Sequence, residues 1–215
     1  MRPTSGEIRE TPSVPLAGHL LPAIVQSIRR DHRNMEQLLG ILEQELVIFR
    51  RGERPDFDIL AGIVEYFRSC PDCCHQPKEA LVLAALKEQA PDRAPAPLEE
   101  EAECRQAQAS LDHFAGLIEN VINEKEVSRE AVIAAAKDFA AHVERPIRFA
   151  EGELLPAALQ SLTLQTWAAL DEKLANKGDP IVDPVMEARF GKLADRFGKW
   201  ERENQAERAW LSQGR

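Results

Sequence analysis

The chain has 215 residues, 44% of them hydrophobic and 29% charged, so it is long enough for one domain with a substantial core. Its 14 prolines and 11 glycines follow no repeat, which excludes collagen-like and low-complexity proteins. With 27 basic and 36 acidic residues the net charge is −9, which opposes binding to nucleic acid and to anionic membrane surfaces. Neither is therefore expected as a partner.

No apolar run reaches the roughly 18 to 20 residues that a membrane span requires. The first residues, MRPTSGEIRETPSVPLAG, contain no hydrophobic segment typical of a signal peptide, so we expect a cytoplasmic protein. A disulfide framework is not expected, because a reducing compartment keeps thiols free and the cysteines are few and clustered. The four cysteines are Cys70, Cys73, Cys74 and Cys104.

The first long helix is expected after a proline-containing arm. Residues 1–17 combine prolines with small and charged residues, which predicts a flexible arm. From about residue 18 to residue 50, apolar residues recur every three or four positions, and this spacing predicts an amphipathic helix. Its buried stripe consists of Leu21, Ile24, Ile28, His32, Met35, Leu39, Leu42 and Leu46. Asp56 follows as a candidate cap for the next helix.

The second helix is predicted in two parts. Its apolar stripe contains Leu60, Ile63, Val64 and Phe67, and then Val82 and Leu86. Pro71 and Pro77 lie between the two parts, so a kink or a restart is expected there. Steps of four residues from Phe67 place His75 and Glu79 on the same inward face.

Two further helices complete the predicted bundle. After a proline-punctuated loop at 90–97, a third apolar stripe begins at Cys104, and a fourth begins after Ser128 and is expected to be interrupted at Pro146. Four helices joined by short connections predict an all-α antiparallel four-helix bundle over residues 18–160. Residues 161–215 are expected to add C-terminal helices, at 162–174 and about 185–211, that pack on or near the bundle.

The polar residues on the inward faces require partners, because an unpaired buried carboxylate is strongly unfavourable. His75 and Glu79 lie one helical turn apart, about 6 Å along the axis, so both could reach one cation, with His32 as a ligand from the neighbouring helix. Alternatively, His75 and Glu79 form a hydrogen-bonded pair, and His32 is a buried histidine bonded to a backbone carbonyl.

The segments DHRNMEQLL and PDCCHQPKEALV resemble the motifs of hemerythrin-like HHE cation-binding proteins. The segments FAEGELLPAAL, LTLQTWAALDEK and MEARFGKLADRF follow in the order expected of one bacterial branch of that family, so the resemblance covers about residues 20–197. It implies a four-helix bundle holding a non-haem di-iron centre, with histidine and carboxylate ligands from all four helices. Such proteins bind or sense dioxygen, or handle iron.

Only part of that ligand set is present. The resemblance assigns His32 to the first helix, and His75 and Glu79 to the second. When the apolar stripe sets the alignment, Glu103 and Cys104 occupy the Glu-His pair of the third helix, so a cysteine replaces a histidine.

The ligand positions of the fourth helix fall at Pro146 and Ala150, and neither side chain can bind a metal. His142 and Glu151 could substitute only if the proline rotated the helix substantially, so they are not expected to take part. We therefore expect one metal ion, iron or zinc, or none. Its candidate ligands are His32, His75, Glu79 and Cys104.

Three functions are compatible with these residues, and no catalytic residue is predicted. The first is a hemerythrin-like protein that binds a metal ion or small ligand for sensing or regulation rather than turnover. The second is a metal-free scaffold whose C-terminal helices, with Trp167, Trp200 and Trp210, cover the bundle or form a homodimer surface. The third, an oxygen-binding or redox di-iron protein using His142 and Glu151, is the least favoured.

Cys70, Cys73 and Cys74 are expected to be free thiols rather than a redox or zinc site.

Overall fold

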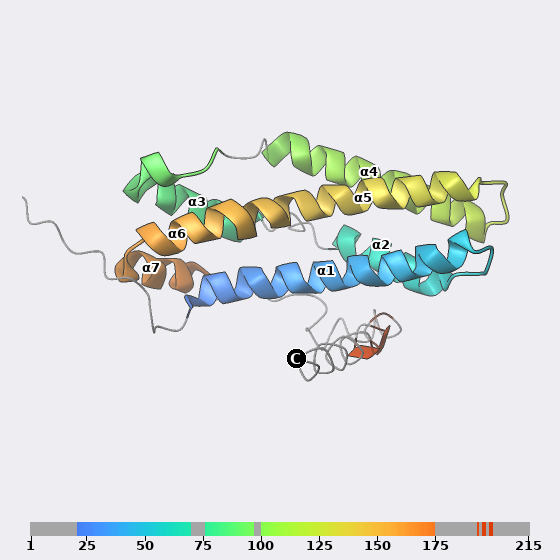
Figure 1. The fold of residues 1–215 in the computed structure, drawn as a ribbon, viewed down its shortest axis with the longest axis horizontal. Coiled ribbons are helices and arrows are strands. Elements are labelled where there is room, and N and C mark those ends of the chain that lie inside the picture. The colour runs from blue at the N-terminus through green and yellow to red at the C-terminus, as the bar shows by residue number, and fades with distance from the viewer. Residues whose placement is uncertain are drawn as a thin grey trace, which may run out of the picture.

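The computed structural model describes residues 21–69, 76–96 and 100–174, together with Leu193, Asp195, Arg196, Gly198 and Lys199. The predicted arm at 1–17, the cysteines of the 70–75 segment and two of the three tryptophans lie outside the described residues. Every regular element in the described part is helical, which confirms the predicted all-α class (Figure 1).

Four long helical columns form the bundle, and a further helix closes one end (Figure 1). The second column consists of two helices, α2 and α3, and the fourth runs through α5, a π-helical turn and α6 without a break in the ribbon. The elements are α1 (Ala23–Arg50), α2 (Phe57–Ser69), α3 (Gln76–Gln89), a 3-10 turn (Pro91–Arg93), α4 (Glu100–Ile122), α5 (Arg129–Phe149), the π turn (Ala150–Leu154), α6 (Leu155–Ser161) and α7 (Leu164–Leu174). Within the described residues, no helix is both long enough and apolar enough to cross a bilayer.

The helices begin at residues that the sequence marks as caps. The Asp56 carboxylate accepts hydrogen bonds from the backbone N–H groups of Asp58 and Ile59 at 3.0 and 3.3 Å, as predicted. Ser128 caps α5 in the same way. The cap of α1 comes from a residue distant in the sequence, so no local pattern predicts it. The Asp171 carboxylate of α7 accepts from the N–H groups of Ala23 and Ile24 at 3.0 and 2.8 Å, and so joins α7 to α1.

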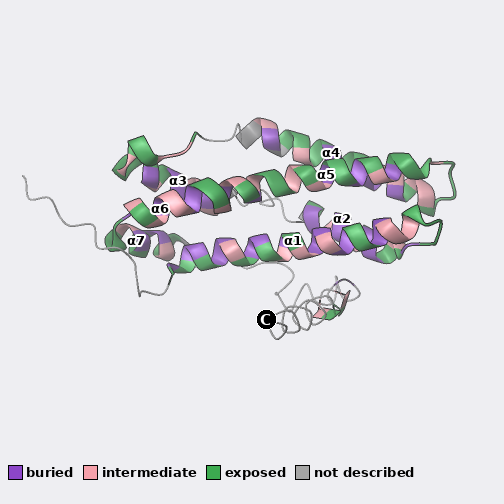
Figure 2. Cartoon of the chain, in the orientation of Figure 1, coloured by how far each residue is buried: buried purple, intermediate pink, exposed green. Residues whose placement is uncertain are grey.

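Buried residues line the inward faces of the columns and form two separate apolar clusters (Figure 2). One cluster, between α1, α2, α4 and α5, contains the ring of Phe139, whose centroid lies 5.0 Å from that of Phe67 and 6.2 Å from that of Phe114. The other joins α1 to α3, α6 and α7. On α1, Ile28 belongs to this second cluster and Met35 to the first, so His32 lies at the junction between them.

One expectation about the fourth helix needs correction. Pro146 does not interrupt the fourth helix, since α5 continues to Phe149 and the π turn follows directly. An interior proline lacks the N–H that would bond the carbonyl one turn earlier and ordinarily kinks or breaks a helix, but here the helical path continues past Pro146 into the π turn. Trp167 is 2% exposed and belongs to the second cluster, so it covers the bundle, which is one of the two roles expected for the three tryptophans.

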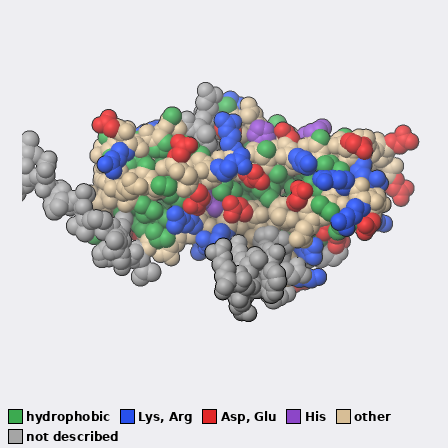
Figure 3. Space-filling view, in the orientation of Figure 1, with side chains coloured by type: hydrophobic (Ala, Val, Ile, Leu, Met, Phe, Trp, Pro, Cys, Tyr) green, Lys and Arg blue, Asp and Glu red, His purple; other side chains and the backbone are tan. Residues whose placement is uncertain are grey.

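Residues near the C-terminus also contact the bundle. Leu193 is buried in the first cluster, and its side chain lies over Gly62 of α2. Arg196 donates a hydrogen bond to the Gln44 side chain at 3.0 Å and lies 3.8 Å from the buried Glu45 carboxylate. The described part of this segment therefore contacts both α1 and α2. On the face drawn in Figure 3, acidic and basic side chains are interspersed.

Candidate metal centre

His32 is the centre of a buried polar cluster between α1, α3 and the π turn. Its Nε2 atom lies 2.9 Å from Glu79 Oε1, and its Nδ1 atom lies 2.9 Å from Glu151 Oε1. The imidazole is 2% exposed, and Glu79 is 9% exposed. The predicted inward orientation of Glu79 is therefore confirmed, and the predicted alternative of a backbone carbonyl partner for His32 is wrong.

The cluster extends to the surface through Glu151 and Arg29. Arg29 Nε donates a hydrogen bond to Glu151 Oε2 at 3.2 Å, and the side chains of both residues are about one third exposed. When His32 is protonated, the two cations and the two carboxylates balance. The four residues then form a neutral chain from solvent to the interior.

The pKa of His32 is shifted by opposing effects. Burial lowers the pKa, because a charged imidazolium is poorly solvated in the interior. The hydrogen bonds and negative charges of Glu79 and Glu151 outweigh burial, and the pKa lies above its ordinary value of 6.5. A histidine with a carboxylate on each ring nitrogen uses both nitrogens as donors, which requires the protonated form.

A second buried ion pair lies directly beside this cluster. Lys78 Nζ lies 2.5 Å from Asp31 Oδ2 and donates to Ser27 Oγ at 2.9 Å. The side chains of Lys78 and Asp31 are 15% and 8% exposed. Because Asp31 precedes His32 and Lys78 precedes Glu79, two adjacent cross-helix pairs attach the first turn of α3 to α1.

The structure describes two of the four candidate metal ligands in full. His32 and Glu79 are brought together, as expected. His75 and the side chain of Cys104 lie outside the described residues. Glu103, beside Cys104 on α4, is buried, and its Oε1 atom lies 2.6 Å from Arg145 NH1, so it pairs with α5.

Glu151, which is not expected as a metal ligand, forms part of the His32 cluster. Ala150 is fully buried, as the stripe predicts, and Glu151 reaches Nδ1 of His32 from the flank of the helix. The chain is π-helical from Ala150 to Leu154, and a π turn holds more residues than an α turn, so an α-helical count misplaces the side chains here. His142 stays apart, with its Nε2 atom 3.9 Å from Asp138.

Sequence reasoning also missed Arg29, Asp31 and Lys78. Asp31 adjoins the His32 stripe and Lys78 adjoins Glu79, so an i, i+1 inspection of the two motifs could have found both charges. Asp31 and Lys78 carry opposite charges on neighbouring helices, and this pairing is what the sequence could have indicated. No sequence pattern links Arg29 to the site, because its partner Glu151 is not expected there.

The described donors do not by themselves make up a metal site. Glu79 and Glu151 approach opposite nitrogens of the His32 ring, so the two carboxylates cannot share an ion through it. Among the residues that the structure describes, no three His, Cys, Asp or Glu side chains gather closely enough to hold a metal ion. A metal between His32 and Glu79 would therefore need ligands beyond the described side chains.

In the metal-free protein, we expect His32 to make stability depend on pH. Because its folded pKa is raised above 6.5, its contribution to the free energy of unfolding is complete below about pH 6.5 and is lost as the pH rises through the folded pKa. Urea unfolding at a series of pH values, with a chelator present, measures this loss. A His32→Gln variant supplies the background from other groups. A stability that rises with pH relative to this variant contradicts the assignment.

Comparison with known proteins extends this description to the family level. A family model described as the Hemerythrin HHE cation binding domain matches residues 23–158, more than half of the chain. No curated protein and no solved structure matches the chain. The matched range runs from the first residue of α1 into α6, so it contains all four columns and the whole His32 cluster. The chain belongs to the hemerythrin HHE cation-binding domain family.

Proposed function

We propose that this protein binds at most one metal ion between α1 and α3, and that the ion serves sensing or regulation rather than catalytic turnover. The supporting observation is the 2.9 Å separation between His32 Nε2 and Glu79 Oε1. An imidazole nitrogen and a carboxylate oxygen are both ordinary ligands of iron and zinc, so these two atoms could hold one ion in place of the proton that they share.

Glu151 has a different role in this proposal. It holds Nδ1 of His32, on the side of the ring away from Glu79, at 2.9 Å. A carboxylate on the outer nitrogen fixes the tautomer and the orientation of a ligating imidazole and increases its basicity. Arg29 in turn holds Glu151, so it acts on the site only through that carboxylate.

A second metal lacks ligands in the fourth column. Pro146 and Ala150 stand at the positions where the family resemblance calls for ligands, and the Ala150 methyl group is fully buried there. Glu151 is engaged by His32 and Arg29. The remaining ligands of the single ion would be His75 and Cys104. Bound iron or zinc would supply a positive charge and a position for a small ligand.

A metal-free scaffold is the alternative, and the charge balance of the cluster favours it. Arg29, protonated His32, Glu151 and Glu79 neutralise one another without an ion. Bound metal must displace the proton between His32 and Glu79, which makes binding weaker at low pH. In this alternative the cluster only fixes α3 and the π turn against α1.

Metal analysis of the purified chain separates these functions. After incubation with ferrous iron or zinc and removal of the excess, we expect at most one bound ion per chain. A Glu79→Ala variant should lose the ion and the thermal stabilisation that comes with it, while Glu151→Gln should weaken binding roughly 10- to 100-fold. His75→Ala and Cys104→Ala test the two ligands predicted from sequence.

Glu153→Gln is the matched control, because Glu153 lies on the same π turn but is exposed. Its metal content should equal that of the unmodified chain. Two ions per chain would overturn the mononuclear proposal in favour of a di-iron protein. No bound metal under any of these conditions would leave the scaffold as the function.

A further inference from the structure

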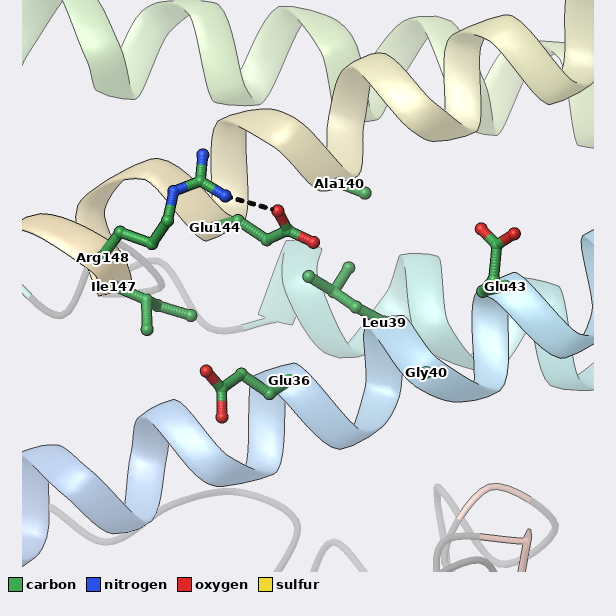
Figure 4. A pocket seen from close by; sticks show the side chains of 8 residues that line it. All are labelled: Glu36, Leu39, Gly40, Glu43, Ala140, Glu144, Ile147 and Arg148. Carbon is green, nitrogen blue, oxygen red and sulfur yellow. Dashed lines mark hydrogen bonds and ion pairs between the residues drawn. The ribbon is translucent and has the colours of Figure 1, made fainter. Parts of the chain in front are cut away.

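A groove outside the His32 cluster lies between α1 and α5 (Figure 4). Its volume is about 470 Å³, within the roughly 300 to 1,000 Å³ typical of small-molecule sites. It is lined by Glu36, Leu39, Gly40 and Glu43 of α1, and by Ala140, Glu144, Ile147 and Arg148 of α5. None of these residues belongs to the candidate metal centre.

The groove combines an apolar floor with an acidic rim. Leu39 and Ile147 are buried, and their side chains lie between the two helices in Figure 4. Arg148 NH1 lies 2.8 Å from Glu144 Oε2, so the one cation of the lining is neutralised within the groove. Glu36 and Glu43 are exposed and form no ion pair with the described residues, so the groove has a net negative charge.

The two rim carboxylates are too far apart for one small ion. Glu36 and Glu43 are seven residues apart on α1, about 10.5 Å along the axis and on the same face. Leu39 lies between them along the helix, as Figure 4 shows. The complementary ligand therefore has two separated positive charges joined by an apolar chain.

We propose that this groove binds a small aliphatic diamine, with its ammonium groups at Glu36 and Glu43 and its methylene chain over Leu39 and Ile147. A helical peptide is less suited, because its diameter with side chains, about 10 to 12 Å, requires a longer and wider trough. The inference does not depend on the proposed metal function. It uses later turns of α1 and the turns of α5 that precede the π turn.

The test uses the full chain and octamethylenediamine, an aliphatic diamine that is doubly protonated at neutral pH. Titration calorimetry and two-dimensional amide NMR should show saturable binding, with shifted resonances concentrated on groove residues such as Gly40 and Ala140. The uncharged analogue octanediol should not bind. A Glu36→Gln/Glu43→Gln variant should bind the diamine at least roughly fivefold more weakly, since each exposed charge pair contributes modestly.

Two further variants separate a shaped site from nonspecific attraction. Ala140→Leu keeps every charge but fills the groove, so it should weaken binding at least as strongly. Glu126→Gln/Glu130→Gln removes the same number of exposed charges outside the groove, and it should leave the affinity unchanged. No saturable diamine binding, equal binding of octanediol, an unaffected Ala140→Leu variant, or an equal loss in the control would each overturn the proposal. Binding of a basic peptide in place of the diamine would also overturn it.

Discussion

Replacing His32 with leucine is expected to lower the free energy of unfolding of the metal-free protein by about 3 to 5 kcal/mol, because it leaves a buried carboxylate without its partner. Glu79 is 9% exposed, and His32 is its one hydrogen-bond partner within the described residues. Glu151 contributes less to this loss, since it keeps Arg29 and access to water. Urea unfolding with a chelator present measures the change.

The double variant His32→Leu/Glu79→Leu is the informative control. Replacing both partners of a buried charged pair with apolar residues is often neutral or stabilising. We therefore expect the second substitution to recover most of the stability that the first removes. A double variant as unstable as the single one would mean that packing around His32, rather than the unpaired carboxylate, causes the loss.

Replacing Lys78 with methionine is expected to cost at most about 3 to 5 kcal/mol, because it removes the 2.5 Å ion pair of the buried Asp31 carboxylate. Arg30 lies 4.0 Å from the other carboxylate oxygen and is half-exposed, so it compensates only in part. The same variant should weaken metal binding, since Lys78 and Glu79 are neighbours in the first turn of α3. Urea unfolding and metal titration check the two effects.

Arg148 and Glu144 provide the matched exposed pair. Their side chains are 66% and 47% exposed, four residues apart on α5. Arg148→Met should change the free energy of unfolding by no more than about 0.5 kcal/mol, because water screens an exposed pair. If Lys78→Met proves equally mild, the Asp31–Lys78 pair does not fix α3 against α1.

The first helix shows how far periodicity alone leads. Its predicted stripe is buried from Ile24 to Leu46, and the exception is Leu21, which is 39% exposed just before α1 begins. The helical period also places His32 and Glu79 on inward faces, because in a regular α-helix the spacing between residues decides which face each side chain occupies. The α-helical period does not give the direction of the Glu151 side chain, because the chain is π-helical there.

By itself, the sequence determined the helical class, the four columns, the caps at Asp56 and Ser128 and the inward position of His32 and Glu79. Each depends on residues close together in the chain, where local geometry decides the outcome. Only the tertiary structure decided that Glu151 and Arg29 complete the His32 cluster, that Lys78 pairs with Asp31, and that Asp171 caps α1. These contacts join residues 47 to 148 positions apart, and they depend on how whole helices pack rather than on any local pattern.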